Sequence, residues 1–523
     1  MEHIQCRAPA TGQLLANVRV DNASDVEAAV ARARDAQKAW AQRPIQERSR
    51  ILLKFRDLVL ERGDELTELL SMECGKPRME AYMAEIFTLV DLTTYFAKRA
   101  KRILKRKNIR LHLMVHRKSF LHYVPRGVIG IISPWNFPLI IPAGDMVIAL
   151  LAGNAVVVKP SETTPLIVMK IRELFLEAGV PEDLVQVLNG YGETGAALVN
   201  AGVDKVIFTG SVATGEKIAE SCGRQLIPCA LELGGKAPFI VLPGANLERA
   251  ARAMVWGAFV NSGQVCVSVE RAYVHRSLYE PLVERVVALT NKLRQANPAD
   301  TEIDVGAIID PRQLDISAAQ VADARAHGAT IHTGGEAAEG PGQFFPPTVI
   351  TDAPQHSQTV QKETFGPLLP ILPYDTVEEA IELANDSHLG LMAYVFGPNV
   401  RTGVDVAHKI VSGMVMVDDV FSIYGMPETP WSGVKKSGLG RVHSPGSMRD
   451  MCMTIHINQP LIPLPFNREI WWYPYRPEIY AFVRRLMNFL FGRGLKKLAP
   501  PNDNARNKEL SELLPAAALP TGD

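Results

Sequence analysis

The sequence has few cysteines, and their spacing does not suggest a cross-linked or metal-bound protein. Its 523 residues contain six cysteines at scattered positions, without a CxxC pair. Disulfide frameworks and structural zinc sites need several closely spaced cysteines. The pattern therefore argues against both and predicts no metal site. It is typical of a reducing compartment, so we expect a cytoplasmic protein.

An excess of charge of either sign is also absent. The chain has 56 basic and 56 acidic residues, which gives a formal net charge of zero. Because nucleic-acid-binding proteins usually carry a basic surplus, we expect no nucleic acid as a partner of the whole chain. The first 13 residues lack the basic region and apolar run of a secretory signal.

An uninterrupted apolar run long enough for a membrane span is missing as well. Residues 127–158 contain a single charged residue, Asp145, but prolines and glycines interrupt them. Pro138 and Pro142 are poorly suited to the middle of a long helix. We therefore interpret this region as buried strands and a short helix in an α/β core.

Strand and helix patterns alternate along most of the remaining chain. The first hundred residues predict helices, with a capping box at residues 24–27 and a long helix over 79–104. Helical patterns then separate short apolar runs, which indicates βαβ units and a mainly parallel sheet. Residues 111–123 and 451–458 alternate at period two and predict strands. The expected core strands are 128–132, 155–159, 184–188, 205–208 and 238–241, and a second series begins after residue 266.

Two glycine-containing turns follow predicted strands. Residues 206–216 suit a strand, a turn with Thr209, Gly210 and Ser211, and a helix that contains Gly215. The N–H groups at such a helix start favour a pyrophosphate, although an ordinary βα turn is the alternative. A second loop, with Gly192 and Gly195, has similar composition.

Cys266 ends the segment Asn-Ser-Gly-Gln-Val-Cys, residues 261–266. Small and polar neighbours suit a thiol that a substrate must reach, and nearby backbone N–H groups could hold a negative oxygen. A single cysteine is also often only a small buried apolar residue. The other motifs in the chain decide between these interpretations.

Four segments, in this order, resemble the aldehyde dehydrogenase superfamily. They are Pro-Trp-Asn-Phe-Pro (134–138), Leu-Glu-Leu-Gly-Gly-Lys (231–236), residues 261–266, and Lys-Glu-Thr-Phe-Gly-Pro (362–367). The resemblance covers about residues 8–457. It implies an α/β fold with a Rossmann-type parallel-sheet cofactor domain, an α/β catalytic domain and a small bridging β element. The implied boundaries are 1–110 with 127–233, then 234–443, then 111–126 with 444–458, with 459–523 as a C-terminal extension.

The resemblance also implies the chemistry. Cys266 would attack the aldehyde carbonyl to give a thiohemiacetal, Asn136 and the Cys266 amide would hold the oxyanion, and Glu232 would activate water to hydrolyse the thioester. Lys159 belongs to both the catalytic and the cofactor sets. The other implied cofactor residues are Ile132, Ser133, Pro134, Trp135, Ser161, Glu162, Gly192, Gly195, Thr209, Gly210, Ser211, Gly215, Leu233, Glu363 and Phe365.

The expected cofactor is NAD, with NADP as the alternative. A carboxylate such as Glu162 accepts hydrogen bonds from a free ribose 2′-hydroxyl but repels a 2′-phosphate. The expected partners are a small aldehyde and further copies of the chain, as a homodimer or homotetramer.

The chain departs from the family pattern at two positions, and two other functions are alternatives to the oxidation of an aldehyde to a carboxylic acid. Ser268 replaces a frequent alanine, and Trp431 replaces a usual phenylalanine, which predicts a reshaped substrate tunnel. A CoA-acylating semialdehyde dehydrogenase would lack the water-activating Glu232. A non-catalytic scaffold or membrane-associated protein would not need Cys266, Glu232 and Asn136 together.

The extension after residue 458 departs from the family pattern. Residues 460–480 are rich in proline and aromatics, and residues 500–523 predict disorder. Aromatic, basic and apolar residues in 471–498 suit either packing on a neighbouring subunit or peripheral contact with a membrane.

Overall fold

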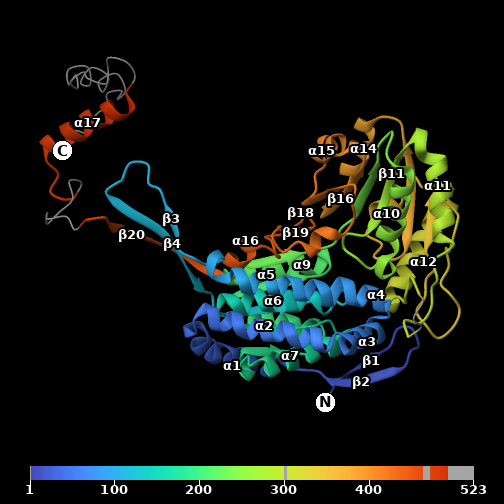
Figure 1. Ribbon diagram of the computed structural model, residues 1–523, viewed down its shortest axis with the longest axis horizontal. Helices are drawn as coiled ribbons and strands as arrows, with labels where there is room; N and C mark the ends of the chain where they lie inside the picture. The colour runs from blue at the N-terminus through green and yellow to red at the C-terminus, as the bar shows by residue number, and fades with distance from the viewer. Residues whose placement is uncertain (1, 300–302, 463–471, 493–523) are drawn as a thin grey trace, which may run out of the picture. The chain divides into compact units, whose positions relative to one another are not determined.

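The computed structural model describes residues 2–299, 303–462 and 472–492 of the chain. Residues 2–107 and 120–457 form the main unit (Figure 1). Residues 108–119 and the described residues after 457 belong to a second unit. Two sheets organise the main unit.

The first sheet has the strand order β19-β9-β8-β5-β6-β7. Its strands from β9 to β7 run parallel, whereas β19 is antiparallel to β9. Side chains such as Val156 and Val157 are fully buried, as expected where helices cover both faces. The strands are β5 (Val128–Ile132), β6 (Ala155–Lys159), β7 (Val185–Val187), β8 (Lys205–Thr209), β9 (Cys229–Glu232) and β19 (Gly438–Leu439).

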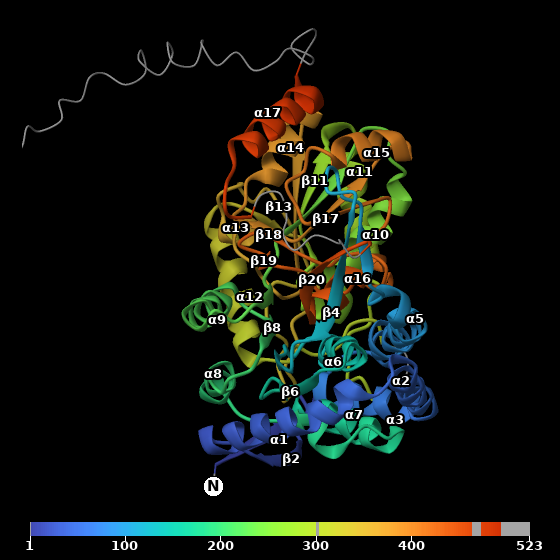
Figure 2. The same ribbon diagram turned by 90° about the vertical axis from the view of Figure 1, so that its left-hand side faces the viewer.

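Helices cover both faces of the first sheet. Figure 2 shows α8 and α9 on one side and α2, α5 and α6 on the other. The bounds are α1 (Ala23–Gln42), α2 (Ile45–Glu61), α3 (Gly63–Cys74), α5 (Thr88–Ile103), α6 (Ile140–Ala152), α7 (Pro165–Ala178), α8 (Gly192–Asn200) and α9 (Val212–Gln225). The apolar run 127–158 forms β5, α6 and β6, which confirms its interpretation. In the described parts of the chain, no helix has the length and apolarity to cross a bilayer.

The second sheet has the order β12-β13-β14-β11-β10-β16-β17, and only its edge strand β12 is antiparallel. The strands are β10 (Ala237–Val241), β11 (Val269–His275), β12 (Thr330–Ile331), β13 (Thr348–Thr351), β14 (Leu368–Tyr374), β16 (Met392–Phe396) and β17 (Met414–Val417). The accompanying helices are α10 (Leu247–Phe259), α11 (Arg276–Thr290), α12 (Pro311–Ala326), α14 (Val377–Asn385) and α15 (Val400–Ala407). The predicted mixed α/β architecture is therefore confirmed.

The N-terminal hundred residues differ from the sequence prediction in three places. They begin with a hairpin of β1 (His3–Arg7) and β2 (Leu14–Arg19), not with a helix. Helix α1 is capped by Asn22, whose side chain accepts from the N–H of Asp25, and not by Ser24. The helix expected over 79–104 is divided into α4 (Arg78–Glu80), a π-helical segment (Ala81–Phe87) and α5. Such π segments often occur at functional sites.

A third sheet has the order β20-β4-β3, with β20 (Cys452–Pro460), β4 (Arg117–Pro125) and β3 (Lys107–Ile109). The strand predicted at 451–458 is confirmed, whereas in the region 111–123 the strand begins only at Arg117. In the extension, α17 spans Pro477–Phe491. The predicted disorder of residues 500–523, and residues 471 and 493–498 of the aromatic and basic segment, lie outside the described residues.

Candidate active site

The four sequence motifs converge between the two sheets. Glu232 ends β9 at the carboxyl edge of the first sheet, and Lys236 directly precedes β10 of the second. Cys266 precedes β11, and residues 363–367 precede β14. Because β10, β11 and β14 are parallel neighbours, the loops before them lie at one edge of the second sheet. Segments far apart in the sequence therefore meet at one place.

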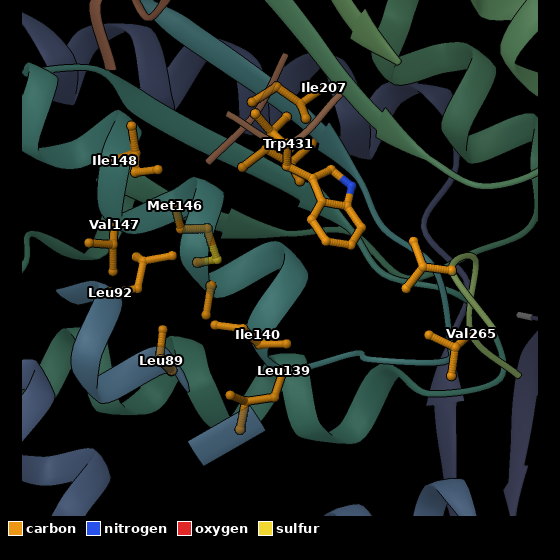
Figure 3. Close-up of a cluster of buried hydrophobic side chains, with 14 of the residues drawn as sticks. Leu89, Leu92, Leu139, Ile140, Met146, Val147, Ile148, Ile207, Val265 and Trp431 are labelled. Atoms are coloured by element: carbon orange, nitrogen blue, oxygen red, sulfur yellow. The ribbon is translucent and has the colours of Figure 1, made fainter. Parts of the chain in front are cut away.

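A cavity of about 710 Å³ lies at this junction. Cys266 and Glu232 both line it, together with Thr209 and Leu233. Ile140, Val265 and Trp431, labelled in the hydrophobic cluster of Figure 3, form part of its wall. The Trp431 ring contacts Tyr424 edge to face, with ring centroids 4.7 Å apart. Trp431 thus lines the cavity, and the reshaping of the substrate tunnel relative to the family stays a prediction.

Cys266 is half-buried on a turn just before β11. Burial raises the pKa of its thiol to about 12, and the charges of Glu363 and Glu232 act in the same direction. The backbone N–H groups of Cys266 and Val267 oppose this rise. A Cβ at Gly235 would lie 2.1 Å from the Cys266 carbonyl oxygen, so only glycine fits beside this turn.

Glu232 is buried, with 3% of its surface exposed. Neither of its carboxylate oxygens has a hydrogen-bond partner among the residues that the structure describes. Burial raises its pKa well above the ordinary value, and the charge of Asp145 adds to this rise. Such a group is an unusual find in a folded protein, because buried polar atoms are normally paired. Its position on the cavity wall suits a group that acts on a bound molecule.

Asn136 lies beside the cysteine loop but not on the cavity wall. Its Nδ2 donates to the carbonyl oxygen of Gln264 at 3.0 Å. Its own carbonyl oxygen accepts from Lys76 Nζ at 2.7 Å and from Asn261 Nδ2 at 3.0 Å. These contacts tie the Pro-Trp-Asn-Phe-Pro segment to the loop that carries Cys266.

The predicted cofactor residues gather at the carboxyl edge of the first sheet. Ile132, Lys159 and Thr209 end β5, β6 and β8, which are neighbours in that sheet. Numbered by chain order within the sheet, its parallel strands follow the sequence 3-2-1-4-5, with the reversal between β5 and β8. In open parallel sheets, dinucleotides bind outside the strand ends at such a reversal.

Polar groups at this edge are available to a ligand. Ser133 Oγ is buried without a hydrogen-bond partner among the described residues. Lys159 is buried, and its Nζ lies 3.2 Å from Glu162 Oε2, whose side chain is partly exposed. Burial lowers the pKa of Lys159. Ser161 lies between them and is also buried.

Two helices begin at the same edge. Ser211 caps α9, its Oγ accepting from the N–H of Thr214 at 3.4 Å. A Cβ at Gly215 would lie 2.5 Å from the side chain of Leu233, so this helix packs closely against residue 233. Gly192 begins α8, and Gly195 packs beside Ile132 and Lys159.

The segment 363–365 completes the predicted set. Glu363 Oε1 accepts from the N–H of Gly235 at 2.9 Å, and burial raises the pKa of Glu363 to about 8. Phe365 meets Trp135 edge to face at 5.2 Å between ring centroids. Trp135 follows Pro134, so the Pro-Trp-Asn-Phe-Pro segment contacts this loop as well.

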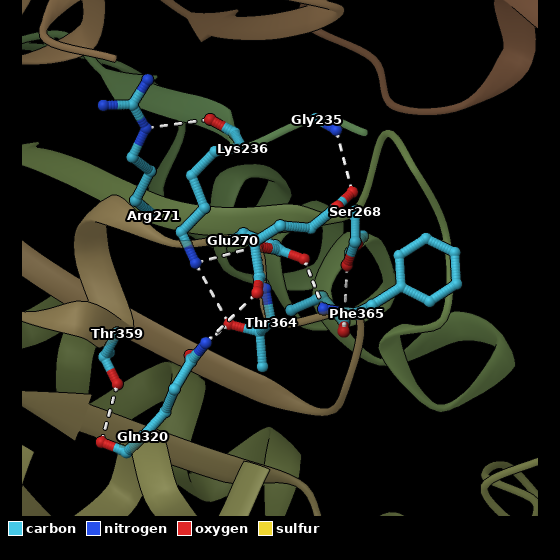
Figure 4. A network of polar contacts seen from close by, with 12 residues as sticks. Gly235, Lys236, Ser268, Glu270, Arg271, Gln320, Thr359, Thr364 and Phe365 are labelled. Carbon is cyan, nitrogen blue, oxygen red and sulfur yellow. Dashed lines mark hydrogen bonds and ion pairs between the residues drawn. The ribbon is translucent and has the colours of Figure 1, made fainter. Parts of the chain in front are cut away.

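A buried ion pair holds this segment in place (Figure 4). The Glu270 carboxylate accepts from the N–H groups of Thr364 and Phe365, each at 2.9 Å. Lys236 Nζ lies 2.8 Å from Glu270 Oε2. Phe365 adopts a φ of 52°, which a non-glycine residue rarely does. The network therefore fixes a strained turn next to the cavity.

Sequence reasoning missed several buried charges around the site. Lys76 Nζ pairs with Glu85 Oε1 at 2.6 Å, and both side chains are fully buried. Glu85 Oε2 also accepts from the N–H groups of Leu139 and Ile140, at the start of α6. In the sequence Glu85 resembles any surface residue of a helix, so no local pattern indicates this role.

Comparisons with known proteins agree with this geometry. The family model described as "Aldehyde dehydrogenase family" matches residues 1–457. A Mycolicibacterium smegmatis protein that carries the name succinate-semialdehyde dehydrogenase [NADP(+)] is 40% identical over 435 residues, covering 83% of this chain and 84% of that one. A Methylomonas sp protein named 4,4'-diapolycopene aldehyde oxidase is 35% identical over 500 residues, covering 94% and 92%. The NAD+ complex of aldehyde dehydrogenase from Bacillus cereus is 34% identical, with a TM-score of 0.84 and coverage of 88% and 94%. The chain therefore belongs to the aldehyde dehydrogenase family and is an NAD(P)-dependent enzyme that oxidises aldehydes.

Proposed function

We propose that Cys266 is the nucleophile of this oxidation and that Glu232 is the base that activates water. The observation that carries the proposal is the shared cavity, in which a thiol faces a buried carboxylate without hydrogen-bond partners among the described residues. An unpaired buried carboxylate destabilises a fold, so a chemical role is the natural reason for its presence.

The residues at the carboxyl edge of the first sheet fit a dinucleotide. The strand reversal, the start of α9 and the unpaired Ser133 Oγ together offer donors where such a cofactor would bind. Thr209, Gly210 and Ser211 would hold its phosphates, and Lys159 with Glu162 would hold its adenosine ribose. Glu363 and Phe365 would hold its nicotinamide end. When bound, the nicotinamide supplies the acceptor for the hydride that leaves the Cys266 adduct, so that a thioester remains on the sulfur.

The chain's own groups account for the other steps. The sulfur of Cys266 attacks the carbonyl carbon while the thiol proton passes to water, and the electron pair of the C=O bond moves to the oxygen. The Cys266 amide and one N–H of Asn136 Nδ2 would then hold the oxyanion. The other N–H of Asn136 Nδ2 donates to the Gln264 carbonyl oxygen, which orients the Asn136 side chain. Glu232 accepts a proton from water as the water oxygen attacks the thioester carbon. The C–S bond then breaks, the carboxylic acid is released, and the proton passes from Glu232 to the sulfur of Cys266.

Two variants test these roles. Cys266→Ala should reduce NAD(P)H formation to a few per cent or less and leave cofactor binding nearly intact, because the thiol lies outside the cofactor edge. Glu232→Gln should retain a burst of NAD(P)H close to the number of sites and then turn over slowly. Stopped-flow absorbance measures both, with Cys6→Ala, a buried cysteine of another cluster, as the control. Substantial turnover by Cys266→Ala would contradict the proposal.

We propose NAD as the preferred cofactor. Glu162 supports this preference, because its carboxylate would meet the 2′ position of the ribose. The name of the M. smegmatis relative gives NADP+ for that protein, whereas the B. cereus structure contains NAD+. Lys159, 3.2 Å from Glu162, is the residue that would tolerate a 2′-phosphate.

We propose that the chain forms a cytoplasmic homo-oligomer, a dimer or tetramer, in which the extension packs on a neighbouring copy. Strand β20 exposes Met453, Ile455 and Ile457, and α17 exposes apolar side chains such as Phe482 and Phe489. Exposed apolar surface of this kind is typical of a protein interface. Peripheral contact with a membrane through α17, which also carries Arg484 and Arg485, is the competing proposal.

The names of two relatives suggest different aldehydes for this chain. One is a short semialdehyde with a carboxylate, and the other is a long, apolar polyene aldehyde. The Methylomonas match covers 94% of this chain, so it extends past residue 457, whereas the M. smegmatis match covers 83%.

A further inference from the structure

The cavity that contains Cys266 and Glu232 is mostly apolar. Among the residues that the structure describes, its only ionisable side chains besides Cys266 and Tyr424 are acids. The acids on its wall are Glu80, Asp145, Glu232 and Asp419. Among the described residues, none of those on the wall is a lysine, arginine or histidine. A substrate carboxylate would therefore enter a mostly apolar site without a cation on its wall to pair with.

One buried cation beside the cavity, Lys76, is already engaged. Lys76 Nζ pairs with Glu85 and donates to the Asn136 carbonyl oxygen. It also lies over the ring of Phe137, 4.4 Å from the ring centroid. Phe137 lines the cavity, whereas the Lys76 side chain is fully buried and does not. Its charge is compensated by Glu85 and is not presented to a substrate.

The apolar wall continues to the surface. Met79, Met83 and Phe87 line the cavity from α4 and the π-helical segment, and Trp256 lines it from α10. These side chains are also exposed, Met79 by 70%, Phe87 by 54% and Trp256 by 51%. Soluble proteins rarely expose several large apolar side chains together unless they bind something there. This rim extends the binding surface beyond the reach of a short aldehyde.

We propose that the substrate is a long, uncharged, apolar aldehyde whose chain lies along Met79, Met83, Phe87 and Trp256. This inference rests on the proposed function of Cys266 and Glu232 and adds the substrate class. Each methylene that leaves water for the wall improves binding about threefold to fourfold until the rim is filled. A carboxylate loses its hydration without gaining a partner, so semialdehydes with a carboxylate are poor substrates.

Steady-state kinetics with matched aldehydes test the proposal. The first comparison is succinic semialdehyde against its methyl ester, which has the same aldehyde without the charge. The second is butanal, hexanal, octanal and decanal. We expect kcat/KM to be about 100-fold higher for the ester than for the acid and to rise along the aliphatic series. Equal or faster turnover of the acid, or no rise with length, would overturn the inference.

A rim variant locates the chain of the substrate. Met83→Glu should lower kcat/KM for decanal about tenfold or more and change the value for butanal little, because butanal does not reach the rim. Met72→Glu changes an exposed methionine of α3 outside the cavity and should alter neither. An equal loss for both aldehydes in Met83→Glu would overturn the placement.

The two proposals fail in different ways. If succinic semialdehyde is the best substrate and its oxidation requires Cys266, the substrate class is wrong and the proposed function stands. If no aldehyde yields NAD(P)H, or if turnover survives in Cys266→Ala, the proposed function itself is wrong.

Discussion

Three carboxyl groups on the cavity wall, those of Glu80, Asp145 and Glu232, have pKa values above those of ordinary surface carboxyls. Burial raises the pKa of Asp145 to about 7 and that of Glu80 to about 8. It raises the pKa of Glu232 further still, with Asp145 as the second cause. The pKa of Glu232, the proposed base, is therefore raised by a neighbouring acid as well as by burial.

Asp145→Asn should shift the pH dependence of turnover. Ionised Glu232 is the active base, so the hydrolysis rate rises with pH as Glu232 loses its proton. Removing the Asp145 charge lowers the pKa of Glu232, and the acid limb of kcat should move to lower pH by roughly 0.5 to 1 unit. Profiles of kcat from pH 5 to 9 measure this, with the exposed Asp405→Asn as the control. A shift to higher pH would contradict the coupling of Asp145 to Glu232.

Glu162→Ser tests the cofactor preference. Loss of the carboxylate should move the ratio of kcat/KM for NAD+ and NADP+ towards NADP+ by about tenfold, which corresponds to about 1.4 kcal/mol. Glu173→Ser, on the exposed side of α7, is the matched control. A constant ratio would mean that Glu162 does not face the ribose.

At the scale of elements, the site is built from loops, and buried polar side chains hold these loops against the neighbouring strands. Glu270 of β11 holds residues 364 and 365 by their N–H groups and pairs with Lys236 before β10. Three parallel strands thereby fix the loops that precede them. Glu85 acts in a similar way, because its carboxylate accepts hydrogen bonds from the N–H groups at the start of α6.

Glu270→Gln should destabilise this region and weaken cofactor binding. It leaves Lys236 buried without its charged partner, which costs about 3–5 kcal/mol. We expect a lower Tm and a higher KM for NAD+, measured by calorimetry and steady-state kinetics. Glu248→Gln removes an exposed carboxylate that pairs with Arg252 and Arg285 and should leave the Tm and the KM for NAD+ nearly unchanged, because solvent screens exposed ion pairs. Similar effects of the two changes would contradict the role of Glu270.

At the scale of the whole molecule, the exposed apolar side chains of β20 and α17 need a partner. Truncation after Asn458 should lower the Tm or reduce the oligomer if the extension packs on a neighbouring copy. Sedimentation velocity and calorimetry of the full and truncated chains measure this.

The membrane alternative predicts a different result for the same truncation. Full-length protein would then sediment with anionic liposomes, more weakly at high salt, and the truncated chain would stay in the supernatant. Binding of this kind, without a change of oligomer, would contradict packing on a neighbouring copy.

Several elements could be predicted from the sequence because their physical cause is local. Residues 128–132, and 155–159 apart from the terminal Lys159, are apolar runs between turns, and they form β5 and β6 with the predicted bounds. Cys266, Glu232 and Asn136 were found by short motifs, since each motif keeps its neighbours in the chain. The sequence predicted Ser24 as the cap of α1, whereas the structure has Asn22 there. Serine and asparagine can both accept the hydrogen bond of an N-cap, so the sequence does not distinguish them.

The sequence alone determined the family and strands β5, β6, β7 and β8 of the first sheet, because each leaves a continuous pattern in the chain. It did not predict β9 or β19, and the roles of Cys266, Glu232 and Asn136 stay predictions. Only the tertiary structure decided the charge and apolarity of the cavity. Asp145 reads as an isolated charge in an apolar run, and Glu85 as a helix surface residue. Met79, Trp256 and Asp419 lie far apart in the chain and share no pattern. They share a wall because the edges of the two sheets meet there. Burial at this place excludes water, so the electrostatic interactions between the side chains are screened less than at the surface.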